Sequence, residues 1–437
     1  MSATAQEGGA TSPPVDELRL RGIVQDEIAR QQAVAGKPAA AHEDDAISAL
    51  QKAWKDFQAK ASETTYPTIG VTGFFQGDGV WFHQDSDSLQ SLGDIPDIVD
   101  FRRARLAAKG QVAENVAYML EMDFAFPGRP TFMDVFVELQ DPDFVSFRFG
   151  QWRQPFGMDA MSSARDLWFL ERALPFAFLP FRQTGIGAFS TEFDDAVTWA
   201  VSGYKFPADP FGGNFGDKGY GMSTRITWNP IYEEVCHEVV HFGFGYSLNE
   251  PSSGRIRYRS TPEVGFTLGD FNGNAVAVPF FVDTGLLNMN WMNLLGLEFA
   301  AARGPWSFQS EFLYVLADQA AAPNLAFPGA YAQVAYVLTG EHHSYNRKQG
   351  VFGRVVPKNN WGKCGCGAWE LAGRWSYIDL DDANVNGGTL HDLTFGLNWY
   401  LNKFTKFQFN YIHAMLDHSL QQDSGTDILA VRAQLDF

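Results

Sequence analysis

The residues of this chain best suited to binding a ligand are its arginines. From residue 66 onward the sequence contains 18 arginines but only 8 lysines. A guanidinium group presents a planar fork of donors that pairs bidentately with phosphate or carboxylate oxygens, whereas an ammonium group acts as a point charge. The composition therefore predicts a protein that binds or guides anions through arginine.

Several of these arginines recur at every second position, and residues spaced in this way lie on one face of a β-strand. Arg103 and Arg105 share one face of their expected strand, opposite Arg102, Ala104 and Leu106, so we expect the pair to point towards water. A second row on one face consists of Arg255, Arg257 and Arg259. Further arginines that lie opposite apolar neighbours are Arg148, Arg225, Arg374 and Arg432.

A structural role is the alternative for the same arginines. They would then pair with carboxylates on the polar faces and only stiffen the wall of the protein. The acidic residues that could pair with them are Glu121, Asp123, Asp134, Glu138 and Glu311. The sequence leaves both interpretations open.

The elements that must position the arginines are strands. From Tyr66 to the end, apolar and polar residues alternate with a period of two, as in Val116 to Phe126 and Val239 to Leu248. The pattern predicts about sixteen strands, an even number typical of bacterial outer-membrane barrels. Because a sheet in hydrocarbon must close to satisfy its backbone groups, we predict an all-β, closed antiparallel transmembrane barrel over residues 66–437. A soluble propeller or sandwich is the alternative.

The alternation is lost between Ser162 and Arg182, which predicts a loop. Arg165, Glu171, Arg172 and Arg182 are expected to border a constriction there. The net charge of -18 leaves the selectivity open, because acids such as those in Asp379 to Asp382 can lie in outer loops or line the entry. The same acidity argues against a nucleic-acid partner.

The N-terminal residues differ from the rest. The composition of residues 1–15 predicts a disordered N-terminal segment. The spacing of apolar residues predicts that residues 16–65 form a short helical or coiled-coil periplasmic extension. The stretch 16–63 is either a cell-wall tether or an extension without a partner. The first residues lack a complete secretory signal, and Ala3-Thr4-Ala5 resembles the small-residue pattern of a signal-peptide cleavage site. We therefore expect an exported protein whose given sequence begins at or near the N-terminus of the mature form.

Cysteine and histidine give no expected metal site. Cys236, Cys364 and Cys366 are too few for a disulfide framework, and no cofactor is expected. His237 and His241 have the spacing of a helical zinc pair, but on a strand they would be roughly 13 Å apart. The pair His342-His343 is expected in a solvated loop.

Specific segments resemble the phosphate-selective porin O and P family of outer-membrane porins. They are FRRARL (Phe101–Leu106), GQWRQPFG (Gly150–Gly157), SSARDLWFLERALP (Ser162–Pro175) and LTGEHHSYNRKQGVFGRVVP (Leu338–Pro357). The resemblance covers most of residues 70–437 but not residues 1–65. It implies a sixteen-stranded, trimeric barrel, an inward-folded loop that narrows the pore, and arginines that guide anions through it.

These observations predict a passive outer-membrane porin that prefers anions, with phosphate or polyphosphate as the leading candidate solute and no catalytic residues. The expected partners are small anions, outer-membrane lipid, lipopolysaccharide, two further copies of the chain, and the cell wall through residues 16–63. One alternative is a general or cation-preferring porin with a tethering N-terminal helix. Another is a barrel lipase, which would need a serine and a histidine at hydrogen-bond distance.

Overall fold

The computed structural model describes residues 65–125, 130–141, 144–207, 218–234, 237–265, 278–362, 364–418 and 423–437. The predictions for residues 1–64 and for Cys236 lie outside the described residues. Within these ranges no helix is long and apolar enough to cross a membrane.

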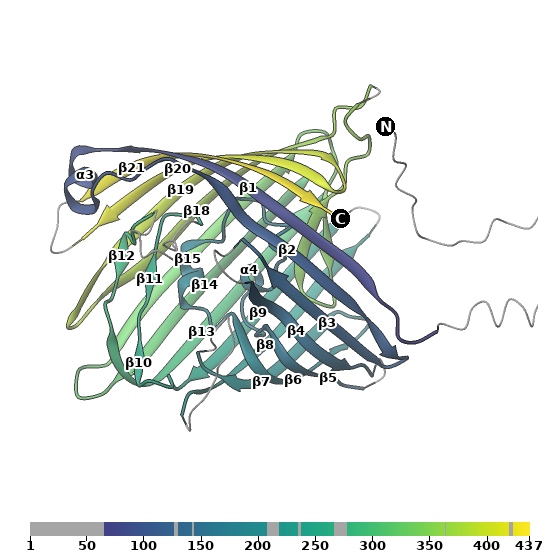
Figure 1. The fold of residues 1–437 in the computed structure, drawn as a ribbon, viewed down its shortest axis with the longest axis horizontal. Helices are drawn as coiled ribbons and strands as arrows, with labels where there is room; N and C mark the ends of the chain where they lie inside the picture. Colours follow the sequence, from purple (N-terminus) through teal and green to yellow (C-terminus); the bar gives the residue numbers. More distant parts are fainter. Residues whose placement is uncertain are drawn as a thin grey trace, which may run out of the picture. The chain divides into compact units, whose positions relative to one another are not determined.

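Sixteen antiparallel strands form a closed barrel (Figure 1), as the sequence predicts. Each strand pairs with the next, and β21 pairs with β1 through partners such as Leu435 and Phe75. The strands are β1 (Gly70–Gln84), β2 (Ile98–Ala113), β3 (Val116–Asp123), β4 (Thr131–Leu139), β5 (Ser146–Arg153), β6 (Arg182–Glu192), β7 (Val197–Lys205), β8 (Tyr220–Glu233), β9 (Glu238–Asn249), β13 (Leu287–Arg303), β14 (Trp306–Gln319), β15 (Leu325–Val337), β18 (Ala368–Asp382), β19 (Val385–Asn402), β20 (Thr405–Asp417) and β21 (Ser424–Asp436).

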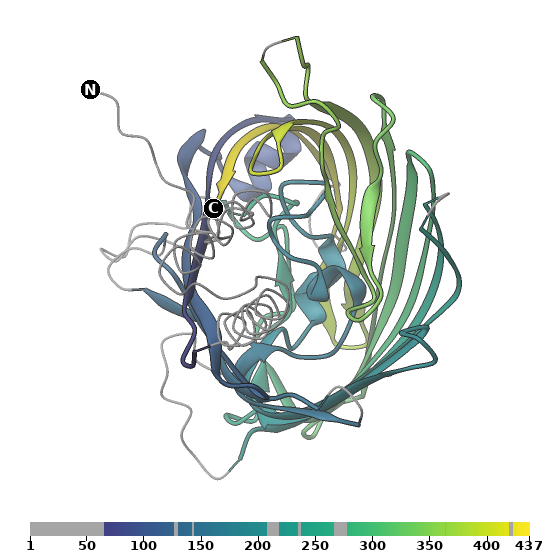
Figure 2. The ribbon, with the colours of Figure 1, turned by 90° about the vertical axis from the view of Figure 1, so that its right-hand side faces the viewer.

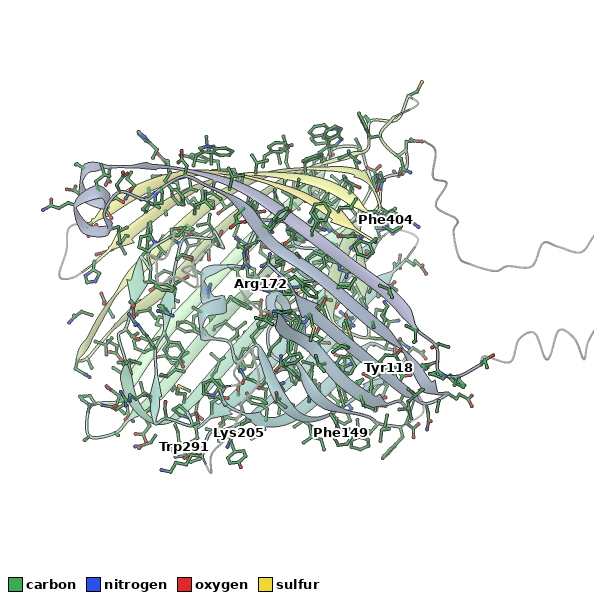
Figure 3. The ribbon with its side chains drawn as sticks, viewed as in Figure 1. Tyr118, Phe149, Arg172, Lys205, Trp291 and Phe404 are labelled. Atoms are coloured by element: carbon green, nitrogen blue, oxygen red, sulfur yellow. The ribbon has the colours of Figure 1, made fainter. Side chains whose placement is uncertain are left out.

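The period-two pattern sorts side chains between lumen and outer face. In β20 the side chains of Lys406 and Gln408 are buried, while those of Phe409 and Tyr411 are exposed on the opposite face. Successive side chains of a strand point to opposite faces, so polar residues gather in the lumen and aromatic residues face outwards. Figure 3 shows Phe149, Trp291 and Phe404 at the periphery and Arg172 in the interior.

The two rims of the barrel differ in the length of their connections. The rim that holds Gly70 and Phe437 has mostly short turns, and we call it the short-turn rim. Its short connections are residues 114–115, 140–145, 193–196, 234–237, 304–305 and 403–404. One connection at this rim, residues 338–367, is long. The opposite rim, the long-loop rim, carries α3 (Ser86–Leu92) and several long connections, among them residues 154–181 and 250–286.

Three of the longer connections carry structure of their own. Residues 154–181 contain α4 (Met158–Met161) and the 3-10 turn η1 (Leu174–Phe178), and Figure 2 shows them inside the ring of strands. The connection between β9 and β13 contains the two-residue strands β10 (Arg255–Ile256), β11 (Arg259–Ser260) and β12 (Val282–Asp283). The long connection at the short-turn rim forms a hairpin of β16 (His343–Asn346) and β17 (Val351–Val355).

Candidate functional site

Residues 154–181 cross the lumen because opposite walls hold them. The N–H groups of Met158 and Asp159 donate to the two carboxylate oxygens of Glu311 on β14, at 2.7 and 2.8 Å. From β1, the side-chain amide of Gln76 donates to the carbonyl of Ala164 at 3.1 Å. We call residues 154–181 the constriction segment. It occupies the lumen as the resemblance implied.

Glu171 of the constriction segment is the point where three arginines meet. Its carboxylate accepts from Arg102 at 2.9 Å, from Arg103 at 2.7 Å and from Arg432 at 2.9 Å. Burial alone would raise the pKa of Glu171, but the three guanidinium groups hold it well below its ordinary value. Glu171 therefore stays ionised and fixes the positions of arginines from β2 and β21.

The prediction that Arg102 lies opposite Arg103 is wrong, and a β-bulge is the reason. The pairing of β1 with β2 shifts between Gln76 and Gly77, so that Gln76 faces Arg103 while Gly77 faces Phe101. Arg102 is the extra residue on the bulged strand, and a bulge re-aims side chains. Both neighbouring arginines consequently reach the same carboxylate in the lumen.

A cavity of about 250 Å³ lies between β2, the constriction segment and the chain that follows β11. The ionisable residues of its lining are five arginines and two acids: Arg102, Arg103, Arg105, Arg172, Arg259, Glu171 and Glu263. Five guanidinium groups against two carboxylates leave the lining with a formal excess of three positive charges. The cavity volume corresponds to roughly eight water molecules, which is room for a small hydrated anion.

Arg172, like Arg259, lines this cavity without an ion pair to a carboxylate among the described residues. Its guanidinium donates to the carbonyls of Asp159 and Ser162, at 2.9 and 2.6 Å, and no carboxylate forms an ion pair with it in the described part of the chain. The ring centres of Phe176 and Phe181 lie 5.1 and 5.2 Å from the guanidinium carbon. Burial lowers the pKa of Arg172 to about 9, so the side chain remains charged at neutral pH.

Other predicted site arginines are neutralised by the barrel wall. Their partners lie on neighbouring lumen strands, as the structural alternative predicted: Arg105 with Asp123, Arg148 with Glu138, Arg182 with Asp134 and Glu121, and Arg225 with Glu298. Arg105 also lines the cavity. A role of these residues in guiding anions stays a prediction.

The expected row of Arg255, Arg257 and Arg259 is not one continuous strand. Arg255 belongs to β10 and Arg259 to β11, because the chain interrupts its pairing between them. Arg257 pairs with Asp283, its Nε 2.6 Å from Oδ1. Of the three, Arg259 lines the cavity, with its guanidinium carbon 4.0 Å from the ring centre of Phe280.

Arg165 does not line the cavity. One of its Nη atoms donates to the hydroxyl of Thr72 at 3.1 Å, and its guanidinium carbon is 4.8 Å from the ring centre of Phe74. The structure thus brings Arg103, Arg105, Arg172 and Arg259 together at one cavity and leaves the remaining predicted site arginines outside it.

Two buried histidines were not expected from the sequence. His343 was expected in a solvated loop, but it is buried, with Nε2 2.5 Å from a carboxylate oxygen of Glu370 and Nδ1 3.0 Å from the carbonyl of Gly353. His241 is buried too and contacts Glu298 and Tyr345. The sequence signal that could have indicated the buried position of these histidines is the run NRKQG with aromatic residues on both sides, because it forms the turn of the β16–β17 hairpin. Among the described residues no cluster of three metal-binding side chains occurs.

Comparisons with known proteins agree with this geometry. A family model described as phosphate-selective porin O and P matches residues 77–437. Porin O of Pseudomonas aeruginosa is 27% identical over 366 residues, which cover 77% of this chain and 80% of that protein. An uncharacterised protein of Caulobacter vibrioides is 27% identical over 363 residues, covering 77% of this chain and 68% of its own length.

Solved structures show the same fold at low sequence identity. In-vitro folded OmpT, an outer membrane protein of Vibrio cholerae, superposes with a TM-score of 0.54 at 9% identity, covering 86% of this chain and 99% of that chain. The trimer form of OmpT gives a TM-score of 0.51 at 9% identity, with coverage of 85% and 99%. At such identities the likeness concerns the barrel architecture alone.

Proposed function

The chain belongs to the phosphate-selective porin O and P family, and we propose that it forms a passive outer-membrane channel through which small anions diffuse, with phosphate or polyphosphate as the leading candidate solute. The observation that carries this proposal is the arginine-lined cavity at the constriction segment. In outer-membrane barrels short turns face the periplasm and long loops the outside. By that rule the short-turn rim is periplasmic, and solutes enter from the long-loop rim.

The arrangement of the acidic residues reconciles an anion channel with a net charge of -18. Lumen carboxylates such as Asp123 and Glu138 form ion pairs with arginines of the barrel wall. Asp379 and Asp381 flank the fully buried Leu380, so they lie on the opposite, outward face near the long-loop rim. The lumen charge at the constriction is consequently positive although the chain as a whole is acidic.

Phosphate fits the cavity better than a featureless halide does. Phosphate oxygens accept from the two parallel N–H groups of a guanidinium fork, which a spherical chloride cannot use in the same way. Arg172 and Arg259 come from two different connections and have no carboxylate ion pair among the described residues. We propose that these two guanidinium groups hold a phosphate, while Glu171 keeps Arg102 and Arg103 in place beside it.

The proposal requires no chemistry at the solute. A diffusion channel needs a water-filled path whose charged side chains set an electrostatic preference, and neither a nucleophile nor a cofactor takes part. We propose a homotrimer whose outer faces contact outer-membrane lipid and lipopolysaccharide. The OmpT structure from Vibrio cholerae has been solved in a trimer form. A cell-wall contact through residues 16–63 stays a hypothesis, tested by deleting that stretch and measuring envelope anchoring.

Reversal potentials in a potassium chloride gradient test the anion preference. The purified protein is inserted into a planar bilayer, and the wild type is compared with Arg172→Ala and with Arg148→Ala, whose arginine is paired with Glu138 in the wall. We expect an anion-selective potential that moves towards zero in Arg172→Ala and changes less in Arg148→Ala. A cation-selective wild type would overturn the proposal and favour a general porin.

A further inference from the structure

The connection between β17 and β18 leaves the lumen and crosses the short-turn rim. The backbone N–H of Trp361 donates to the carbonyl of Leu401, at the end of β19, at 2.7 Å. The ring of Trp361 lies edge-on to Trp399, with ring centres 6.0 Å apart. Trp399 points outwards, because its neighbours Asn398 and Tyr400 are buried on the lumen side. Trp361 therefore lies against the outer face of the barrel.

The outer face at this place is a cluster of aromatic rings. Trp369 stacks on Trp399 with ring centres 5.0 Å apart, and Phe407 lies 6.0 Å from Trp399 on the other side. The indole N–H of Trp399 donates to the carbonyl of Cys366 at 2.9 Å, which ties the crossing chain to the cluster. Trp361 itself is 60% exposed. Indole rings with one polar and one apolar edge favour the membrane–water interface.

The cluster continues the apolar band that faces lipid. On β18 and β19, large exposed side chains follow one another along the outer face towards the long-loop rim: Leu371, Trp375, Leu393 and Phe395. The aromatic cluster ends this band at the short-turn rim. The crossing chain thus lies where hydrocarbon gives way to headgroups.

The charge of this stretch is opposite to that of the whole protein. Residues 358–367 contain two lysines and no acidic residue, in a chain whose net charge is -18. Lys358 is exposed beside the crossing, and Lys403 is exposed in the turn after β19, its amino group 4.6 Å from the ring centre of Phe404. The nearby acid, Glu341, accepts from the Lys358 backbone and from the hydroxyl of Thr339.

We propose that residues 358–362 and 364–367, the rim segment, dock on anionic phospholipid headgroups of the leaflet at the short-turn rim. Trp361 lies at headgroup depth beside Trp399. The amino group of Lys358, which also donates to the carbonyl of Gly340 at 2.7 Å, and the amino group of Lys403 face the lipid phosphates. A basic residue near an anionic membrane surface contributes about 1 kcal/mol, so the two lysines together favour an anionic over a zwitterionic surface roughly 30-fold. This docking is separate from the passage of solute through the lumen.

The free thiol of Cys364 in the rim segment allows a direct test. In a Cys236→Ser, Cys366→Ser background, Cys364 carries an environment-sensitive fluorophore. The protein is reconstituted into vesicles of brominated phosphatidylcholine with or without phosphatidylglycerol that is brominated to the same degree. A matched control carries the label at Glu114→Cys, in an exposed turn of the same rim, with Cys364→Ser in addition.

We expect the label at Cys364 to be quenched at least twofold more than the label at residue 114. We also expect phosphatidylglycerol to increase this quenching, and the double variant K358Q and K403Q to lose the increase. Equal quenching at both sites, or quenching that does not respond to phosphatidylglycerol, would overturn the proposal. So would efficient thiol crosslinking of Cys364 between copies, which would identify a neighbouring subunit as the occupant. Single-channel conductance, measured in parallel, reports independently on the proposed transport.

Discussion

Arg103 and Glu171 are 68 residues apart in the sequence, yet Nη2 of Arg103 lies 2.7 Å from a carboxylate oxygen of Glu171. The contact joins β2 to the constriction segment. Arg432 of β21 binds the same carboxylate, so strands on both sides of β1 hold one point of the segment. The width of the pore therefore depends on a buried charge cluster as well as on the length of the segment.

Replacing Glu171 by glutamine should loosen the constriction segment. Breaking a buried ion pair typically costs about 3–5 kcal/mol, because the partner charges lose their compensation. We expect a lower thermal unfolding midpoint, noisier single-channel currents, and a stronger preference for anions. The exposed Glu192→Gln is the matched control. Quiet currents and unchanged stability in Glu171→Gln would show that the cluster does not position the segment.

Replacing Arg172 by alanine should weaken phosphate block of the chloride current. A hydrogen bond to a charged group contributes about 1.5–3 kcal/mol, so the half-blocking phosphate concentration should rise at least about tenfold. Arg172→Lys keeps the charge but lacks the fork, and an intermediate value is expected. The control is Arg148→Ala, whose arginine lies outside the cavity. Equal effects of Arg172→Ala and Arg148→Ala would contradict the proposed site.

Replacing Glu311 by glutamine should free the start of α4. Both oxygens of Glu311 accept backbone N–H groups, and one of them also accepts from the hydroxyl of Tyr331 at 2.6 Å. Glutamine offers one acceptor oxygen, so one N–H of the segment loses its partner. Larger and more variable single-channel conductance is expected. Tyr331→Phe removes only the hydroxyl contact and should change conductance less; the reverse order would refute the assignment.

The β16–β17 hairpin should loosen as the pH rises. Both ring nitrogens of His343 face acceptors, a carbonyl and a carboxylate, so only the imidazolium form donates to both. Burial lowers the pKa of His343, but Glu370 more than offsets this and raises it above the ordinary value. The stabilisation is complete below about pH 6.5 and is lost as the pH rises through the raised pKa.

Current recordings between pH 5.5 and 9 test whether protonated His343 stabilises the hairpin through its contact with Glu370. Open-channel noise of the wild type should increase with pH, and His343→Gln should be noisy throughout because glutamine has a single donor group. Substitution of the partly exposed His413 by glutamine is the control and should leave the pH dependence in place. A wild type whose noise is independent of pH would contradict the prediction.

The barrel could be predicted from the sequence because its pattern is local. Alternation such as that in β20 follows from lipid on one side of each strand and polar groups on the other. The arginines of β2 show the limit of this reasoning. A one-residue bulge at Arg102 changes which side chains share a face, and nothing in the run FRRARL reveals the register of β1 against β2.

The contents of the lumen were harder to predict, because they depend on contacts between distant segments. Loss of alternation located the constriction segment, but the partner of Glu171 on β21 is 261 residues away. His343 was expected in solvent because its partner, Glu370, belongs to another element. Arg105 and Asp123, by contrast, lie on neighbouring strands. Asp123 is one of the acidic residues that could be named from the sequence as partners of these arginines.

Titration of phosphate into the chloride current of the wild-type channel tests the central claim most directly. Purified protein in a planar bilayer is recorded in potassium chloride while phosphate is added from the side of the long loops. Our account predicts that phosphate blocks the chloride current in a saturable way, at concentrations far below that of chloride, because the cavity with Arg172 and Arg259 holds it. A large current that is indifferent to phosphate would contradict that claim and leave a porin without an anion site.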